Sequence, residues 1–247
     1  MNNKLSIVIL TKNSQKYLKE VLKSASFADE IVVVDNGSTD NTLKIAKEFD
    51  AKTVIQNKWL GFGPQKQLGI DNTNNSWVFI LDSDEIITKE LQQEILSTIQ
   101  NPKFNGYKVA RLNYFFGKPL RYGGLYPDYT VRLFNKNKAY MSNDRVHERV
   151  IVKGDIYKLK NHMIHYAYDT IEQFISKQNQ YSTLGAKPNK IKAIFNPLWS
   201  FIRMYIIKLG FLDGWHGYIV ARLYAQYTLW KYIKSAIITY NKSEKKR

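Results

Sequence analysis

Apolar residues gather in nearly continuous runs along the first third of the chain. The runs cover residues 5–10, 31–34 and 77–81, with little alternation between apolar and polar positions. Such runs are typical of strands that are buried on both faces, as in the middle of a parallel sheet. A shorter run at residues 52–56 predicts a further strand.

Helical periodicity separates these runs. Apolar residues recur every three or four positions over residues 17–25 and 43–49, and shorter helical patterns cover residues 65–70 and 88–99. Strands that alternate with helices predict right-handed crossovers and a mostly parallel sheet with helices on its faces. The first half of the chain is therefore predicted to be α/β.

The pattern changes after residue 99. Shorter, more alternating segments at residues 107–111, 130–134, 150–152 and 163–166 predict strands that extend or flank the first sheet. A helix is predicted over residues 170–184, and helical periodicity returns after Lys187 and Pro188. We therefore expect one domain over residues 1–186 and a basic, aromatic, helical extension over residues 187–247.

The apolar run at residues 77–81 ends in the acidic residues Asp82, Asp84 and Glu85. In open α/β sheets, ligands bind beyond the carboxyl ends of the strands. Residues two apart in extended backbone point the same way, so Asp82 and Asp84 can face one cation. Carboxylate oxygens suit Mg²⁺ or Mn²⁺, and Mg²⁺ commonly binds substrate phosphates as well. The alternative is that these acids decorate the N-terminus of the helix predicted from residue 88.

Asp35 follows the run at residues 31–34 and is predicted to lie at the same edge of the sheet as Asp82. An acidic side chain there can accept hydrogen bonds from a ribose hydroxyl or a base N–H. It can instead cap the turn over residues 36–38. The glycine pattern of a dinucleotide site is missing after the first predicted strand, which argues against an NAD site.

Composition narrows the choice of partners. The chain of 247 residues has no cysteine, which excludes disulfides and thiolate metal sites, and its net charge is +16. This charge indicates an anionic partner: a phosphorylated substrate, an anionic membrane or nucleic acid. We find neither a signal-peptide pattern nor an uncharged apolar run of the roughly 18 residues that a spanning helix needs. We expect a cytoplasmic protein, peripheral at the inner face of the cytoplasmic membrane.

The last quarter of the chain carries most of the charge. Residues 186–247 hold 12 basic and 2 acidic residues, a net charge of +10. Large apolar residues recur there at helical spacing, in one stretch from Trp199 to Leu209 and a second from Trp215 to Trp230. Aromatic residues beside Lys and Arg are typical of helices that lie at a membrane interface. The alternative is that these aromatics pack onto the preceding domain.

Several segments, in their order along the chain, resemble the family 2 inverting glycosyltransferases. These are residues 5–13, 31–40 and 81–85; residues 126–128, 132–134, 146–148 and 210–214 resemble the subgroup of lipopolysaccharide-core β-1,4-glucosyltransferases. The resemblance covers nearly the whole chain and implies a GT-A fold and a nucleoside diphosphate sugar donor. It also implies that Thr11, Asp35 and Lys66 contact the nucleotide, and that Asp82 and Asp84 contact ribose and metal.

Four further residues are candidates around the donor. Asn13 stands where many members of the family have Glu, and we keep it as a contact to the nucleotide sugar. Arg132 is expected to pair with a donor or acceptor phosphate, or else to occupy the polar face of a strand. His165, in preference to His162, is a candidate for a further metal ligand; a buried structural histidine is the alternative.

An inverting transfer also requires a base that takes the proton of the acceptor hydroxyl. Glu148 is our choice, with Asp144 as the fallback and His147 as a third candidate in the same segment. Glu148 is preferred because many family members have an acidic residue in this region.

The sequence thus predicts a Mn²⁺- or Mg²⁺-dependent glycosyltransferase whose donor is UDP-glucose or a similar nucleotide sugar. Its expected acceptor is a lipid-linked glycan such as lipopolysaccharide core, with a protein or teichoic-acid-like acceptor as the alternative. A nucleic-acid-binding module would explain the charge but not the acidic cluster, which would repel phosphates, so no nucleic acid is expected as a partner. A membrane-bound, inactive scaffold is a third possibility.

Overall fold

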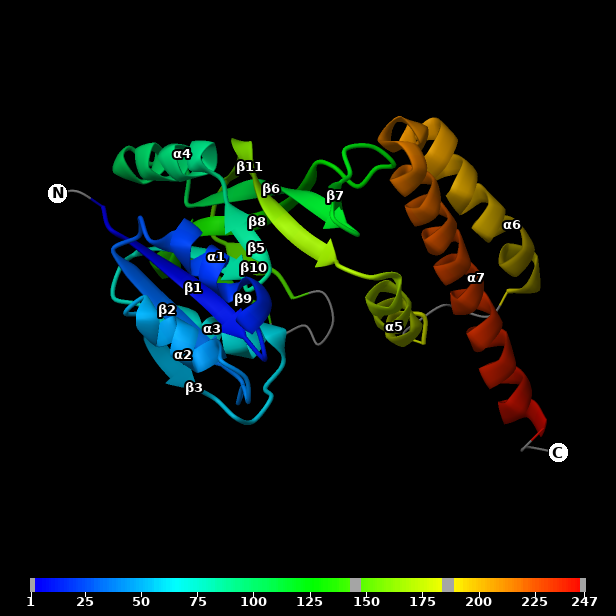
Figure 1. Ribbon diagram of the computed structural model, residues 1–247, viewed down its shortest axis with the longest axis horizontal. Helices are drawn as coiled ribbons and strands as arrows, with labels where there is room; N and C mark the ends of the chain where they lie inside the picture. The colour runs from blue at the N-terminus through cyan, green and yellow to red at the C-terminus, as the bar shows by residue number, and fades with distance from the viewer. Residues whose placement is uncertain (1–2, 143–147, 184–188, 245–247) are drawn as a thin grey trace. The chain divides into compact units, whose positions relative to one another are not determined.

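The computed structural model describes residues 3–142, 148–183 and 189–244. The chain divides into two compact units, Met1–Arg111 with Asp128–His165, and Leu112–Pro127 with Tyr166–Arg247. The domain boundary that we expected between residues 186 and 187 lies outside the described residues. That the two segments fold as separate domains stays a prediction. Figure 1 shows the elements in order from blue to red.

Strands and helices alternate from residue 5 to residue 82, as the apolar periodicity predicts, and a second, short strand then precedes the next helix. The strands are β1 (Leu5–Thr11), β2 (Glu30–Asp35), β3 (Lys52–Ile55), β4 (Trp77–Asp82), β5 (Glu85–Ile87), β6 (Gly106–Phe115), β7 (Lys118–Pro119), β8 (Asp128–Asn135), β9 (Ala139–Met141), β10 (Val150–Val152) and β11 (Ile156–Tyr168). The helices are α1 (Gln15–Ala25), α2 (Thr42–Glu48), α3 (Phe62–Asp71), α4 (Lys89–Gln100), α5 (Ile171–Tyr181), α6 (Lys190–Ile202) and α7 (Gly214–Glu244).

One nine-stranded sheet has the order β3-β2-β1-β4-β8-β6-β11-β5, with β7 paired to β6. Strands β1 to β4 pair in parallel, whereas β8 and the strands after it add antiparallel pairs. The α/β prediction with a mostly parallel first half is therefore confirmed. Strands β9 and β10 form a separate two-stranded sheet that flanks the large one.

Alternate residues of the central strands lie in two hydrophobic cores, one on each face of the sheet. One core joins Ile7, Ile9 and Phe79 to the apolar faces of α1, α2 and α4. The other joins Val8 and Ile80 to α3 and to the β9–β10 pair. Because both faces are covered, the central strands must be apolar on both sides, which is why their runs do not alternate.

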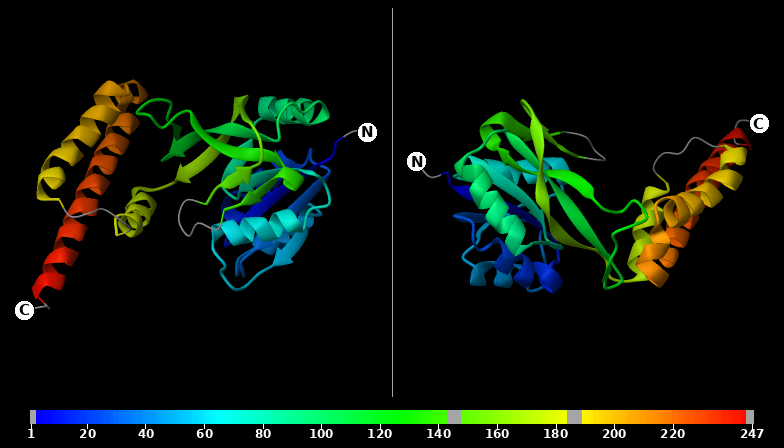
Figure 2. Two further views of the ribbon diagram at one scale, coloured as in Figure 1. Left: turned by 180° about the vertical axis from the view of Figure 1, so that it is seen from behind. Right: turned by 90° about the horizontal axis from the view of Figure 1, so that it is seen from above.

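The second unit has a core of its own around Phe115, Leu120, Tyr168, Phe174 and Val220. Helices α6 and α7 lie side by side in every view of Figures 1 and 2. A π-helical turn at Arg203–Ile207 and a tight 3₁₀ turn at Gly210–Asp213 connect them. The buried Asp213 stabilises the second turn, since its carboxylate accepts hydrogen bonds from the backbone N–H groups of Arg121 and Tyr122. Among the described residues, none of the helices combines the length and apolar content needed to cross a bilayer.

Candidate active site

The carboxyl ends of β1, β2 and β4 bring three candidate residues to one edge of the sheet. Thr11 lies opposite Asp35 in the pairing of β1 with β2, and Leu10 lies opposite Asp82 in the pairing of β1 with β4. The shared edge expected for Asp35 and Asp82 is therefore present. It follows directly from parallel pairing, because parallel strands end on the same side.

Asp35 is fully buried and its carboxylate is fixed by its neighbours. Thr11 Oγ1 donates to Asp35 Oδ2 at 2.9 Å, and the backbone N–H of Ser38 donates to Asp35 Oδ1 at 2.8 Å. Asp35 thus caps the turn that follows β2, which was one of its two expected roles. Ser38 Oγ also donates to Asp35 Oδ2 at 2.5 Å, so these three bonds leave about one of the roughly four acceptor positions of the carboxylate for a ligand.

Asn13 holds the same loop from the other side. Its Oδ1 accepts a hydrogen bond from the backbone N–H of Thr39 at 2.8 Å, and its own N–H donates to Ser38 Oγ at 2.8 Å. In the structure Asn13 therefore orders the loop after β2, and its contact to a nucleotide sugar stays a prediction.

Lys66 on α3 connects two carboxylates that are far apart in the sequence. Its Nζ lies 3.3 Å from Asp82 Oδ1 and 3.3 Å from Glu148 Oε1. Helix α3 approaches the β9–β10 segment closely at Gly63, where a Cβ would come within 2.5 Å of the Ser142 carbonyl oxygen. The missing side chain at Gly63 lets α3 pack against the strand that leads toward Glu148.

The acidic cluster after β4 divides into three different environments. Asp82 Oδ2 accepts a hydrogen bond from Arg132 Nη2 at 2.7 Å, whereas the fully buried Glu85 accepts from the same nitrogen at 2.5 Å. Glu85 Oε1 also lies 3.7 Å from Arg111 Nη1. Asp84 is the exposed member, with 40% of its side chain accessible.

This arrangement corrects two local expectations. Residues 83 and 84 form a turn rather than extended backbone, so the rule that residues two apart share a face does not hold for Asp82 and Asp84. The strand β5, which begins with Glu85, lies between Asp84 and α4, so the acidic residues do not decorate the first turn of that helix. Thr88 supplies the N-cap of α4 instead, because its Oγ1 accepts from the N–H of Leu91.

The charged side chains form one alternating series, which we call the ion-pair chain. It runs through Glu148, Lys66, Asp82, Arg132, Glu85, Arg111 and Asp128. Lys66, Arg132 and Glu85 are buried within it. Each buried charge has an opposite charge beside it, the condition under which burial of a charge is tolerated.

The ion-pair chain sets the protonation of its members. Burial would raise the pKa of Asp82, but the positive charges of Arg132 and Lys66 outweigh it and hold that pKa well below its usual range. Burial raises the pKa of Glu85, although Arg132 opposes the shift. Burial would also lower the pKa of Arg132, yet Asp82 and Glu85 raise it, so Arg132 stays charged.

Asp84 and His165 fit a divalent cation. Asp84 Oδ2 lies 3.7 Å from His165 Nε2. Two ligand atoms at about 2.1 Å from one octahedral ion are about 3.0 Å apart when adjacent and about 4.2 Å apart when opposite, so both side chains can bind the same ion after a shift of less than about 1 Å. No group of three His, Cys, Asp or Glu residues suited to a metal occurs in the part of the chain that is described, so donor phosphates and water would complete the shell. That Asp82 binds the metal stays a prediction, since Lys66 contacts one of its carboxylate oxygens and Arg132 contacts the other.

Some candidates are not tested and others were missed. Asp144 and His147 lie outside the described residues. His162 lies on β11, where its carbonyl oxygen accepts a hydrogen bond from Thr88 Oγ1 at 3.0 Å. The sequence did not predict that the buried Glu85 pairs with Arg132, and it did not single out Gln65. Gln65, beside Lys66 on α3, is buried, and neither atom of its amide has a hydrogen-bond partner among the described residues.

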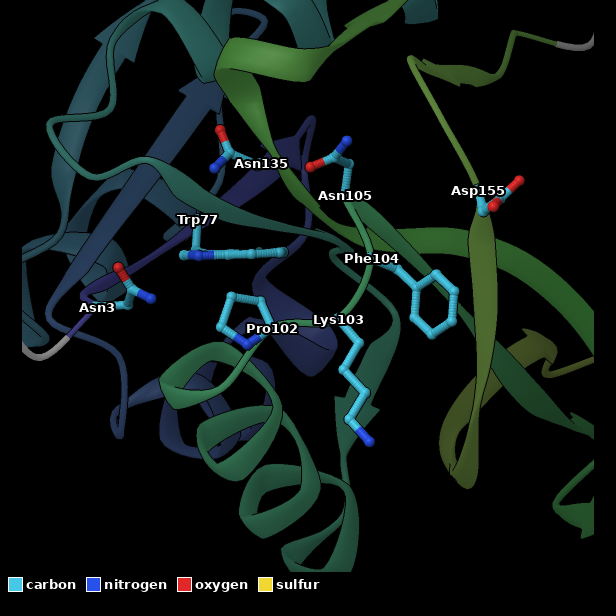
Figure 3. A pocket seen from close by; sticks show the side chains of 8 residues that line it. All are labelled: Asn3, Trp77, Pro102, Lys103, Phe104, Asn105, Asn135 and Asp155. Atoms are coloured by element: carbon cyan, nitrogen blue, oxygen red, sulfur yellow. The ribbon is translucent and has the colours of Figure 1, made fainter.

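A hollow of about 440 Å³ in the first unit lies away from these residues (Figure 3). It is lined by Asn3, Trp77, Pro102, Lys103, Phe104, Asn105, Asn135 and Asp155. Trp77 begins β4 and Asp82 ends it, so the hollow lies at the opposite end of the strand from the acidic cluster. It contains none of the candidate residues.

Comparison with known proteins agrees with this geometry. The family model described as Glycosyl transferase family 2 matches residues 6–210. The chain is 30% identical to the lipopolysaccharide core biosynthesis glycosyltransferase LpsC of Rhizobium meliloti, over 90% of this chain and 88% of that protein. It is also 30% identical to the uncharacterized glycosyltransferase RP128 of Rickettsia prowazekii, over 90% of this chain and 83% of that protein.

A solved structure shares the fold. The crystal structure of S. aureus TarS residues 1–349 in complex with UDP matches 97% of this chain and 92% of that chain, with a TM-score of 0.50 and 17% identity. At this identity the likeness concerns the fold alone. The expected GT-A fold, with long C-terminal helices, is confirmed.

Proposed function

Because the chain belongs to glycosyltransferase family 2, we propose that it transfers a hexose from UDP-glucose or a similar nucleotide sugar to a lipid-linked glycan. The observation that carries this proposal is the ion-pair chain at the carboxyl edge of the sheet. It places Lys66 Nζ on α3 3.3 Å from Asp82 at the end of β4 and 3.3 Å from Glu148 in the segment before β10, although the three residues are far apart in the sequence.

The nucleotide is assigned to the ends of β1 and β2 and to α3. Asp35, held by Thr11, offers an acceptor position to a ribose hydroxyl or a base N–H. Lys66 offers a positive charge to the diphosphate. The buried amide of Gln65 supports this placement, because buried polar groups are normally hydrogen-bonded and a bound donor would supply the partner that the described residues do not.

The acceptor is assigned to the side of Glu148. Its carboxylate takes the proton of the acceptor hydroxyl while that oxygen attacks the anomeric carbon and the bond to the diphosphate breaks. Lys66, 3.3 Å away, holds the carboxylate in position. A Mg²⁺ or Mn²⁺ ion bound by Asp84 and His165 would stabilise the negative charge of the leaving diphosphate.

Lipopolysaccharide core is the acceptor that we favour. The relative LpsC, named for lipopolysaccharide core biosynthesis, is similar over 90% of this chain. The net charge of +16 suits an acceptor that carries phosphate groups.

A panel of nucleotides and nucleotide sugars, each with and without Mn²⁺, tests the proposal by thermal shift and by transfer of labelled sugar. A ligand at 100 times its Kd adds about 2.7 kcal/mol of stability. We expect UDP and a UDP-sugar to raise the melting temperature more with Mn²⁺, and label to reach an extracted core oligosaccharide. Asp35→Asn should weaken the shift, while the exposed Lys44→Gln serves as the matched control. If label enters only a protein or a teichoic-acid-type polymer, that molecule replaces lipopolysaccharide core as the acceptor. If the protein binds no nucleotide and instead binds DNA in a salt-dependent way, the proposal is overturned.

A further inference from the structure

Helix α6 exposes an apolar face that covers its whole length. Five large residues, at positions i, i+3, i+4, i+7 and i+8, lie on this face and are 55–71% exposed: Ile191, Ile194, Phe195, Leu198 and Trp199. We call them the α6 ridge. Soluble proteins rarely expose contiguous apolar surface of this kind unless it contacts something.

Helix α6 contacts α7 beside the α6 ridge. Asn196 Nδ2 donates to the hydroxyl of Tyr232 at 2.7 Å, and the ring of Phe201 lies 5.9 Å from that of Tyr218. Ile194 and Leu198 of the ridge line a hollow of about 420 Å³ together with residues of α7. The ridge thus borders the contact with α7, and all five of its side chains nevertheless stay 55–71% exposed.

The exposed apolar surface continues beyond the helix. Large apolar residues between α6 and the start of α7 are also exposed: Ile206, Ile207, Leu209, Phe211, Leu212 and Trp215. Together with the α6 ridge they form a series that includes two tryptophans, the side chain most typical of a membrane–water interface.

The charge around this surface has one sign. Between residues 173 and 243 the only acidic residue in the sequence is Asp213. It is buried and accepts backbone hydrogen bonds. Lys192, Arg203 and Lys208 are exposed. A second copy of the chain would bring the same positive charge to this face and be repelled, whereas an anionic surface would be attracted.

A cavity beside the ridge adds cationic contacts. It has a volume of about 570 Å³ and is lined by the loop at residues 123–125, by residues of α6 and α7, and by the segment that follows α6. Trp199, Arg203 and Lys208 are among its lining residues. A phosphate headgroup beside the ridge would therefore meet two positive charges next to an aromatic ring.

We propose that the second unit docks on an anionic lipid bilayer through the α6 ridge, with Lys192, Arg203 and Lys208 contacting lipid phosphates. A helix of 13 residues is about 20 Å long, shorter than the roughly 30 Å of a bilayer core, so α6 lies in the plane of the interface. Docking itself does not depend on the proposed function. Its role does, because docking would bring the active enzyme to the membrane surface where a lipid-linked acceptor lies.

Vesicle co-sedimentation of the full chain tests this docking. Phosphatidylglycerol-containing vesicles should bind the protein, phosphatidylcholine vesicles should bind it less well, and added salt should release it. Ile191→Ser/Phe195→Ser should weaken binding about tenfold or more, because both side chains lose their burial in the interface. The control is Ile55→Ser, which removes an isoleucine in the first unit that is 61% exposed, against 70% for Ile191.

Charge variants separate insertion from simple adsorption. Lys192→Glu/Lys208→Glu should weaken binding to anionic vesicles, whereas Lys44→Glu on α2 should change it much less. If the Ile191→Ser/Phe195→Ser variant binds vesicles as well as the parent protein, only charge adsorption exists and the proposal is overturned. If it instead abolishes a concentration-dependent dimer while no vesicle binding occurs, the ridge is a contact between copies.

The same variants separate this proposal from the proposed function. The ridge residues are exposed, so Ile191→Ser/Phe195→Ser should melt at the same temperature and show the same nucleotide-dependent shift as the parent protein. Transfer to a delipidated acceptor should also be unchanged. If the protein docks on vesicles but binds no nucleotide, the proposed function is refuted and the membrane-docking proposal still holds.

Discussion

The buried pair of Glu85 and Arg132 allows a prediction with a defined magnitude. Arg132→Met keeps most of the side-chain length but removes the cation whose Nη2 lies 2.5 Å from Glu85 Oε1. Of its hydrogen-bond and ion-pair partners among the described residues, the fully buried Glu85 would keep the backbone N–H of Asp82 at 3.0 Å and Arg111 at 3.7 Å, which is itself paired with Asp128. Removing one partner of such a pair costs about 3–5 kcal/mol because the other charge stays buried.

The loss should depend on pH. Without Arg132 the pKa of Glu85, already raised by burial, rises further above its value of about 4.3 in the unfolded chain. Above that value the folded state then holds more protons than the unfolded state, so stability falls as pH rises. The deficit of Arg132→Met should be largest at pH 7 and shrink by up to about 1.4 kcal/mol for each unit of pH lowered toward 5.

Urea unfolding followed by circular dichroism, at matched slopes, measures both effects. The double variant Arg132→Met/Glu85→Gln is the control, because it removes both charges and should recover much of the lost stability. A deficit for Arg132→Met below about 1 kcal/mol, or one that is equal at pH 5 and pH 7, would refute the role given to Glu85.

Three further predictions concern chemistry and packing. Glu148→Gln should keep donor binding and lose about 10²–10⁴-fold in the rate of labelled-sugar transfer, as for removal of a base; an active Glu148→Gln with an inactive Asp144→Asn would move the role to Asp144. Asp84→Asn should remove the Mn²⁺-dependent part of the UDP-induced thermal shift and abolish transfer, and normal turnover would exclude it as a ligand. Gly69→Ala should lower the unfolding free energy by about 1–3 kcal/mol, since its Cβ would overlap Val8 on β1, and unchanged urea unfolding would contradict that packing.

The parallel half of the fold and the edge that carries the site could be predicted from the sequence. Apolar runs at β1, β2 and β4 report strands covered on both faces, and the residues that follow parallel strands must gather at one edge. Asp35 and Asp82 were found in this way, because their position depends only on where each run ends.

The partners of each charge were decided by the tertiary structure. Glu85 meets Arg132 across 47 residues, and Lys66 meets Glu148 across 82. Local sequence patterns do not reveal pairings over such distances. The buried, structural role of Glu85 could therefore not be distinguished from the roles of Asp82 and Asp84 in the same four-residue cluster.

The face that α6 exposes was also decided beyond the local pattern. Helical spacing indicated apolar residues from Trp199 onward but not the ridge that starts at Ile191, and it did not distinguish Tyr205, whose ring stacks on Phe201, from the exposed Ile206. Periodicity shows that a helix has an apolar face. Whether that face is buried depends on how the helix packs against its neighbour, and beside α7 the residues of the α6 ridge stay 55–71% exposed.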